Sequence, residues 1–304
     1  MADISNFRDS PNFGALCGIA AMFSVQLGAS VSTGLFANLG PTATASLRLV
    51  FAAAIILLVV RPRIPERREW KAIALYGVAT ALMTIFYFSA VARIPLGVAS
   101  SLEFLGPLVI ALFGVRSRIG LLMPVLAFVG VVLLTEPWGV DRLDPVGVAF
   151  GVGAGAMLGA YVLLTRRLGE ADGFSNLAWS ITAAAIVSIP FGVVTATGVP
   201  TLSDLAISLG AAILLPLLPY ALEFIAMRRL RSATYSILLS LEPFVAVLIG
   251  WVVLQQLLQP TQCLGILLVV ATSISAVTFS KSASQISEKG FTHEGVQEQN
   301  RSSP

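Results

Sequence analysis

Four charged side chains lie inside long apolar stretches of this sequence and could carry chemistry: Arg48, Glu103, Glu223 and Glu242. A charge at the centre of a bilayer costs about 2.5–3.5 kcal/mol on insertion scales, so each group needs a partner, a watery cavity or a ligand. Buried carboxyl groups can take up and release protons, and an arginine can bind a carboxylate through two parallel hydrogen bonds. These residue types therefore predict binding of a small charged solute and of protons.

The depth of these charges within their apolar stretches supports this interpretation. The depth of each residue follows from its distance to the nearer end of its own apolar stretch, at 1.5 Å per residue. This distance is about 15 Å for Glu242, about 12 Å for Glu103 and about 10 Å for Arg48. Each glutamate could also be a structural group hydrogen-bonded to a neighbouring helix. Arg48 could hold a substrate carboxylate or form a fixed ion pair with Glu103, and the sequence leaves both alternatives open.

Uncharged polar residues add further candidate ligands. Gln26 offers an amide near the middle of the first apolar stretch, although a contact between helices would also explain it. Glu223 lies near the end of its stretch and could reach towards Arg228 or Arg229 instead of a substrate. The candidate substrate ligands are Arg48, Glu103, Glu242, Gln26, Tyr87, Tyr220 and Glu223, and the candidate proton carriers are Glu103 and Glu242.

Helix-breaking residues accompany the charges. Pro216 and Pro219 precede Glu223, while Gly106, Pro107 and Pro243 lie beside the two central glutamates. Such residues either kink membrane helices or unwind the backbone beside a cavity. A separate run with small residues at four-residue spacing, Gly151, Gly155 and Gly159, predicts close helix packing.

The elements that must position these residues are membrane helices. Of the 304 residues, 56% are apolar and 12% are charged, and the mean hydropathy is +0.87. A bilayer core needs roughly 20 apolar residues in a helix. Ten segments meet this pattern: 14–37, 41–60, 72–92, 95–115, 119–135, 146–165, 174–197, 205–227, 232–254 and 260–280. The remaining residues are too few for a separate soluble domain.

Basic residues in the loops predict the orientation. If the segments alternate, one set of loops carries Arg61, Arg63, Arg67, Arg68, Lys71, Arg116, Arg118, Arg166, Arg167, Arg228, Arg229 and Arg231, and the other carries Arg93 and Arg142. The positive-inside rule then places both termini in the cytoplasm. The polar tail, residues 281–304, is predicted to be disordered and cytoplasmic.

The two halves of the chain resemble each other. A shift of 136 residues superposes the stretch 88–114 on 224–250, matching Arg, Ser and Pro positions as well as aliphatic ones. Chance similarity between apolar helices is the alternative. Duplication of a five-helix unit predicts an all-α membrane protein of two inverted repeats, residues 14–135 and 146–280, because an odd number of helices reverses the second copy.

Several kinds of chemistry are disfavoured. Cys17 and Cys263 lie in apolar segments and the one histidine, His293, lies in the tail, so we expect no disulfide framework, metal, cofactor or catalytic triad. The arginines in the loops explain the net positive charge of the chain, so a nucleic-acid-binding function is not needed to explain it. The alternatives from other functional classes are a channel and an intramembrane enzyme.

Short motifs then suggest a family. The motifs LEFLGP (102–107) and LEP (241–243) resemble the EamA-type repeats of the drug/metabolite transporter superfamily. Its bacterial threonine/homoserine exporter branch is similar over QLGAS (26–30), LRL (47–49), PLGVASSLEFLGPLVIALF (95–113), LPYALEFIA (218–226) and SLEP (240–243).

This resemblance implies a secondary transporter of the bacterial inner membrane, not an enzyme. Its cargo would be a small hydrophilic amino acid exported by proton antiport, with the bilayer as its other partner. The same residue types as in that branch stand at Arg48, Glu103, Glu223 and Glu242. Another metabolite or a cationic drug is the alternative cargo, and the sequence does not determine the oligomeric state.

Overall fold

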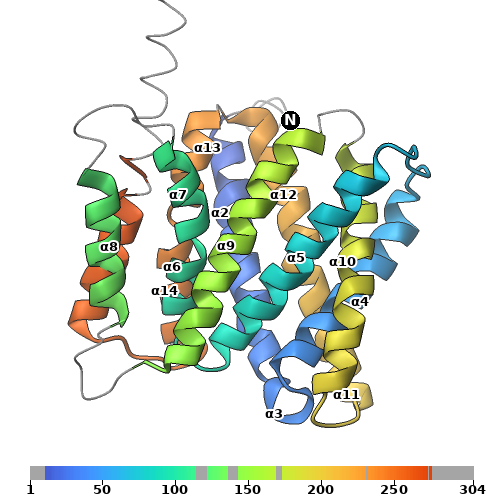
Figure 1. The fold of residues 1–304 in the computed structure, drawn as a ribbon, viewed down its shortest axis with the longest axis horizontal. Coiled ribbons are helices and arrows are strands. Elements are labelled where there is room, and N and C mark those ends of the chain that lie inside the picture. Colours follow the sequence, from blue (N-terminus) through green and yellow to red (C-terminus); the bar gives the residue numbers. More distant parts are fainter. Residues whose placement is uncertain are drawn as a thin grey trace, which may run out of the picture.

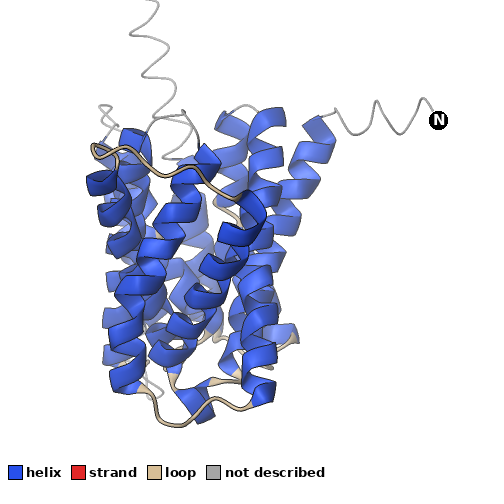
Figure 2. Cartoon of the chain, turned by 90° about the vertical axis from the view of Figure 1, so that its right-hand side faces the viewer, coloured by secondary structure: helices blue, strands red, loops and turns tan. Residues whose placement is uncertain are grey.

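The computed structural model describes residues 11–113, 122–135, 143–168, 173–230, 232–272 and 274–275, and over these ranges the chain contains helices and no strand (Figure 2). The first half forms α2 (Pro11–Thr33), α3 (Phe36–Leu39), α4 (Pro41–Val60), α5 (Trp70–Val91), α6 (Leu96–Glu103), α7 (Leu105–Phe113) and α8 (Leu122–Thr135). The second half forms α9 (Pro145–Leu168), α10 (Gly173–Thr195), α11 (Leu202–Ala212), the π-helical turn η2 (Ile213–Leu217), α12 (Leu218–Arg229), α13 (Ser232–Leu239), α14 (Glu242–Val252) and a final helix, Pro260–Thr272.

These helices suit a membrane. Within the described ranges, six helical spans are long and apolar enough to cross one, the sixth being Leu202–Arg229, which runs through α11, η2 and α12, and shorter apolar helices accompany them. Large apolar side chains such as Phe128 and Val194 are 69% and 84% exposed, which is stable only against lipid or another apolar surface. The chain is therefore a multi-pass membrane protein. The predicted tail lies outside the described residues.

The predicted segments fall on these helices with informative differences. The segment 41–60 matches α4 residue for residue, whereas the first segment ends early, at Thr33, and continues as the short α3. The fourth and ninth segments, predicted as single spans, are each divided between two consecutive helices, and the eighth remains one helical span that the π-helical turn η2 interrupts between α11 and α12. The end of the fourth segment, the start of the fifth and the end of the tenth lie outside the described residues.

The two halves interlock in one bundle. Helix α9 packs along α5, α10 along α4 and α5, α12 along α2, and α14 along α6 (Figure 1). The largest buried cluster combines Phe88 and Leu102 from the first half with Val245 and Ile249 from the second. Side chains from both halves therefore form the core at the centre of the molecule.

The bundle has one basic end. Figure 1 shows the loop after α4 and the end of α12 at the top of the molecule, and these segments carry Arg61, Arg63, Arg67, Arg68, Arg228 and Arg229. We call this the basic end. Helix α2 starts at it and α9 starts at the opposite end, so these corresponding helices of the two halves run in opposite directions (Figure 1). Arg116, Arg118 and Arg231 lie outside the described residues.

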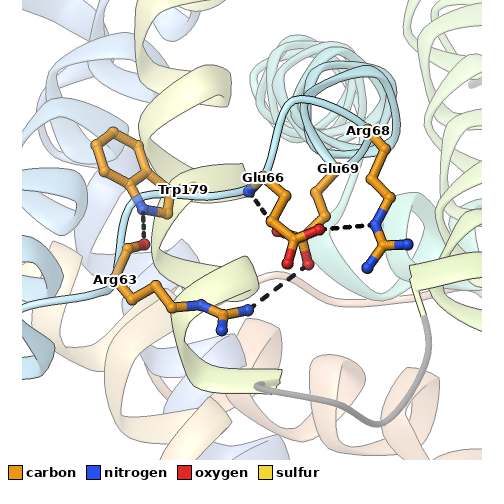
Figure 3. A network of polar contacts seen from close by, with 5 residues as sticks. All are labelled: Arg63, Glu66, Arg68, Glu69 and Trp179. Carbon is orange, nitrogen blue, oxygen red and sulfur yellow. Dashed lines mark hydrogen bonds and ion pairs between the residues drawn. The ribbon is translucent and has the colours of Figure 1, made fainter.

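Side-chain contacts hold the loop at the basic end in place. Trp179 on α10 donates a hydrogen bond from Nε1 to the carbonyl oxygen of Arg63 at 2.8 Å (Figure 3). Arg63 approaches Glu69 at 3.9 Å, and Arg68 pairs with Glu66 at 2.8 Å (Figure 3). At the opposite end Arg93 pairs with Asp144 at 2.8 Å. The Arg93 guanidinium, followed by the N–H of Val146, lowers the pKa of the Asp144 carboxyl from its usual value.

Three helix breaks lie near the middle of the bundle. Helix α6 ends at Glu103 and α7 begins after Phe104, while α14 begins at Glu242 after a turn at Ser240 and Leu241. The third break is at Leu215, which has an extended backbone (φ −154°, ψ 110°) before Pro216. Of the two alternatives considered from the sequence, a kink or an unwound backbone, the breaks at Phe104 and Leu241 keep helical backbone angles and are interruptions of the kink type, and the backbone is extended at Leu215. Phe104 and Ser240 are 136 residues apart, which is the shift that aligns the two halves.

Glycines let α9 approach the first of these breaks. A Cβ atom on Gly155 would lie 2.7 Å from the carbonyl oxygen of Leu102 and 3.0 Å from that of Glu103. A Cβ atom on Gly106 would collide with the carbonyl oxygen of Gly155. Close packing was predicted from the glycine spacing and is confirmed. The backbone at Glu103 is thus held directly against the second half.

A larger residue at Gly155 should separate these helices. We expect Gly155→Leu to lower stability by about 1–3 kcal/mol, because the clash is with backbone atoms that cannot rotate away. The measurement is the midpoint of thermal unfolding in detergent. Gly210→Leu is the matched control, since a Cβ atom on Gly210 would meet nothing within 4 Å. Equal midpoints for the two variants would contradict this account of the packing.

Candidate functional site

A cluster of polar side chains lies where the two halves meet. Its members come from α2, α4, α5, α6 and α14, and we call them the central cluster: Gln26, Arg48, Tyr87, Ser100, Glu103 and Glu242. Five of the seven predicted substrate ligands belong to it. Burying so many polar groups in a membrane protein is unfavourable unless they satisfy one another or bind a ligand.

Hydrogen bonds centred on Gln26 join the two halves. Gln26 is 1% exposed, and its Nε2 donates to Oε1 of Glu242 at 3.2 Å. Its Oε1 accepts from the Tyr87 hydroxyl at 3.2 Å, and the oxygens of Tyr87 and Ser100 lie 2.8 Å apart within hydrogen-bond distance. The amide therefore presents its donor to the carboxylate and its acceptor to the hydroxyl. This network fixes the orientation of the Glu242 side chain.

Arg48 holds the break at Leu215. Its Nη1 donates to the carbonyl oxygen of Leu215 at 2.6 Å, and its guanidinium lies 4.9 Å from the centroid of the Phe88 ring. Ser24 donates to the carbonyl oxygen of Leu214 at 2.7 Å, so side chains of the first half satisfy both carbonyls of the distorted turn. The arrangement fixes both the guanidinium and the broken helix.

One donor of Arg48 is left for another partner. The side chain is 3% exposed, and its Nε has no hydrogen-bond partner among the described residues. Also within that part of the chain, no salt bridge within 4 Å joins Arg48 to Glu103, although the two groups interact electrostatically. The fixed ion pair considered from the sequence is therefore not formed in this conformation. A buried donor without a partner favours a ligand or a water at this place.

Glu103 lies at the end of α6, where the helix breaks. It is partly exposed and lies within electrostatic range of both Glu242 and Arg48. Its position brings a second carboxylate to the same region as the guanidinium. One cation, two carboxylates, an amide and hydroxyls are thus gathered from both halves. Such a set matches a small molecule that carries both charges.

The two remaining predicted residues lie to one side of the central cluster. The hydroxyl of Tyr220 is hydrogen-bonded to that of Tyr161, which in turn bonds Tyr76, and Tyr220 interacts electrostatically with Arg48. Glu223 is hydrogen-bonded to the hydroxyl of Tyr235 on α13. Tyr220 therefore borders the cluster, whereas Glu223 belongs to a separate pair nearer the basic end.

The arginines beside Glu223 make aromatic contacts. Arg228 lies 5.5 Å from the ring centroid of Phe224, and Arg229 lies 5.4 Å from that of Phe13. Phe224, Ile225, Arg228 and Arg229 also line a cavity of about 440 Å³. Their spacing places them on a face of α12 other than that of Glu223.

The sequence interpretation missed several partners in this region. Ser100, Tyr235, Tyr161, Tyr76 and the carbonyl of Leu215 all bond a predicted residue or extend its network. One usable signal was that tyrosine is scarce, with five in the chain, and that all five fall inside predicted apolar segments. A buried tyrosine hydroxyl normally finds a hydrogen-bond partner. Among the described residues, no group of three or more His, Cys, Asp or Glu side chains could hold a metal ion.

Known proteins resemble this chain over most of its length. The threonine/homoserine exporter RhtA of Escherichia coli K12 is 34% identical over 274 residues, which cover 89% of this chain and 93% of the exporter. The RhtA of Salmonella typhimurium LT2 is 33% identical over 275 residues with the same coverage. Protein PecM of Dickeya dadantii is 28% identical over 244 residues, covering 76% and 81% of the two chains.

Fold and family agree with these relatives. A protein of known crystal structure superposes with a TM-score of 0.59 at 20% identity, covering 89% of this chain and 98% of its own, which supports the fold alone. The EamA-like transporter family model matches twice, over residues 12–136 and 145–278, as expected for a duplicated unit. Because both halves match this model and the RhtA exporters align over 89% of the chain, this protein belongs to the EamA-like transporter family and is a transporter, not an enzyme.

Proposed function

We propose that this protein exports small hydrophilic amino acids, such as threonine and homoserine, across the bacterial inner membrane in exchange for protons. The central cluster carries the proposal, because it places a buried guanidinium within electrostatic range of Glu103, and Glu103 within electrostatic range of Glu242, between the halves of the bundle. The names of the RhtA relatives support the cargo. The basic end would face the cytoplasm, as the positive-inside rule predicts.

An amino acid zwitterion fits the charges of the cluster. Its carboxylate would bind Arg48, whose Nε has no partner among the described residues. Its ammonium would bind Glu103 or Glu242, which lie within electrostatic range of each other. The hydroxyl of threonine or homoserine would bond Gln26, Tyr87 or Tyr220. Glu223 is outside this set because its hydrogen bond goes to Tyr235.

Competition between ammonium and proton would couple transport to the proton gradient. A proton that enters from the periplasm and neutralises Glu103 or Glu242 removes the charge that holds the ammonium, so the substrate leaves outwards. Loss of that proton to the cytoplasm restores the charge for the next substrate. Two inverted halves with broken helices at the site suit such alternating access.

Exchange of labelled threonine tests the proposed cargo. Proteoliposomes preloaded with unlabelled threonine or homoserine should take up labelled threonine faster than empty ones, and the uptake should saturate. Protein-free liposomes are the control. Absence of exchange by protein that elutes as a single folded species would contradict the cargo. Exchange of a labelled cationic drug by protein that does not exchange threonine would support the alternative cargo. Threonine uptake that does not saturate would indicate a channel.

A further inference from the structure

The hydroxyl of Ser100 bonds other helices, whereas that of its neighbour bonds its own helix. A serine inside a helix commonly donates to the carbonyl oxygen four residues earlier. Ser101, the next residue along α6, does so, with a 2.7 Å bond to the carbonyl oxygen of Gly97. Ser100 instead lies 2.8 Å from the hydroxyl oxygen of Tyr87 on α5 and 3.4 Å from Oε1 of Gln26 on α2. Its hydroxyl is therefore part of the contacts between helices.

The orientation of the Gln26 amide determines which of its atoms meets the two hydroxyls. Its Nε2 donates to Oε1 of Glu242 at 3.2 Å, so its acceptor, Oε1, faces Tyr87 and Ser100. We call Gln26, Tyr87 and Ser100 the amide–hydroxyl row. All three side chains are buried, and the row begins at Glu242, one of the two carboxylates proposed to hold the substrate ammonium.

Counting hydrogen-bond donors shows what the row can offer a ligand. The Tyr87 and Ser100 hydroxyls carry one proton each, and the 2.8 Å contact between their oxygens uses one of the two. The amide oxygen of Gln26 accepts the other. Its distance to the Tyr87 oxygen is 3.2 Å, against 3.4 Å to that of Ser100, which favours the order in which Ser100 donates to Tyr87 and Tyr87 donates to Gln26. Both protons are then used inside the row, and the Ser100 oxygen keeps its lone pairs.

A ligand group that meets the Ser100 oxygen must therefore bring a proton of its own. The side-chain hydroxyl of threonine or homoserine has such a proton, whereas a methyl group in the same place has none to donate. In threonine the hydroxyl and the ammonium lie on neighbouring carbons, and Gln26 connects Glu242 with the rest of the row. One small ligand can thus place its ammonium at the carboxylate and its hydroxyl at the row.

We propose that Ser100 binds the side-chain hydroxyl of the exported amino acid by accepting a hydrogen bond from it, and so selects cargo with a hydroxyl over cargo without one. This inference rests on the proposed export of threonine-like amino acids and adds the residue that recognises the side chain. A site built to hydrogen-bond a substrate hydroxyl rejects an analogue without one, because the polar groups of the site are then left unpaired.

Competition between threonine and valine tests this selection. Valine matches threonine in shape but has a methyl group in place of the hydroxyl. In proteoliposomes with equal pH on both sides, threonine should inhibit the exchange of labelled threonine at a lower concentration than valine does. The measured preference is the ratio of the two half-inhibiting concentrations. Ser100→Ala should reduce this preference about three- to tenfold, as expected for one hydrogen bond between uncharged groups.

The neighbouring serine provides the matched control. Ser101 is also buried on α6, but its hydroxyl bonds its own helix, so Ser101→Ala should keep the wild-type preference. A merely structural role of Ser100 would lower the exchange rate and leave the preference unchanged. An unchanged preference in Ser100→Ala, or the same reduction in Ser101→Ala, would overturn the proposal.

A third competitor tests the direction of the hydrogen bond. O-methylthreonine keeps the side-chain oxygen of threonine but has no proton on it. It should compete more weakly than threonine, and Ser100→Ala should leave its half-inhibiting concentration unchanged, because no hydrogen bond to Ser100 is lost. Competition as strong as that of threonine in the wild type would overturn the assignment of Ser100 as the acceptor.

Failure of the subsite and failure of the proposed function give different results. Threonine exchange whose preference over valine is unchanged in Ser100→Ala rejects the subsite and leaves the cargo standing. Folded wild-type protein that exchanges no threonine contradicts the cargo and overturns the subsite with it. Because the pH is equal on both sides, failure of proton antiport alone leaves the expected preference as stated.

Discussion

Arg48→Lys is expected to reduce threonine exchange by roughly 10- to 150-fold, which corresponds to the 1.5–3 kcal/mol of a hydrogen bond to a charged group. Arg48 bonds the carbonyl of Leu215 through Nη1 and has its Nε left for a substrate carboxylate. A lysine keeps the charge, but its single ammonium cannot reproduce the planar fork that serves both partners. The measurement is the initial rate of labelled threonine exchange in proteoliposomes.

The matched control for this change is Arg93→Lys. Arg93 pairs with Asp144 at the opposite end of the bundle and is about half exposed, so its replacement should alter exchange less than about twofold. Size-exclusion profiles of both variants show whether each has folded. Wild-type exchange by a folded Arg48→Lys variant would contradict the role of the guanidinium in substrate binding.

Glu242→Gln and Glu103→Gln are expected to uncouple efflux from the proton gradient. A glutamine at position 242 can still accept the hydrogen bond from Gln26, so the network around it is preserved while the titratable group is removed. If one of the two glutamates carries the proton, the glutamine variant at that position should lower gradient-driven efflux about tenfold or more. The double variant should lose gradient-driven efflux entirely. The measurement is threonine efflux with and without an imposed pH gradient.

A glutamate outside the helices provides the control for these variants. Glu66 is paired with Arg68 on the exposed loop at the basic end, and Glu66→Gln should leave the response to the gradient unchanged. If both single variants and the double variant keep gradient-driven efflux, neither carboxylate carries the coupled proton. The zwitterion site could then persist, but proton antiport through these residues would be excluded.

Much of the fold could be predicted from hydropathy alone, because a bilayer imposes helices of a given length. The predicted segment 41–60 is α4, and proline and glycine beside the glutamates indicated helix breaks, as kinks or as unwound backbone. The third break, at Leu215, directly precedes Pro216, which the sequence offered as a helix breaker, but the contacts that satisfy this break come from packing. Ser24 and Arg48 satisfy its carbonyls from other helices, and Gly28 leaves room for it, as a Cβ atom there would lie 2.8 Å from Cβ of Leu215.

The members of the central cluster could be predicted because isolated charges are costly in a membrane and therefore tend to share one site. Their partners could not be predicted in the same way. Arg48 donates its hydrogen bond to a backbone carbonyl, and because every residue has one, the residue types do not indicate this acceptor. Glu223 pairs with Tyr235 on another helix, whereas sequence proximity favoured Arg228 and Arg229. Hydroxyl residues such as Ser100 are common in apolar helices, so only the hydrogen bonds seen in the structure show that Ser100 belongs to the site.

Proton release on substrate binding tests most directly whether the amino acid and the proton compete for the same carboxylates. Purified protein in weakly buffered detergent solution is mixed with threonine at a pH where the site is partly protonated, and a pH indicator dye records the change. The account predicts acidification that saturates with threonine in the wild type and is absent from the Glu103→Gln, Glu242→Gln double variant. Threonine binding to the wild type without proton release, or equal release from the double variant, would contradict it.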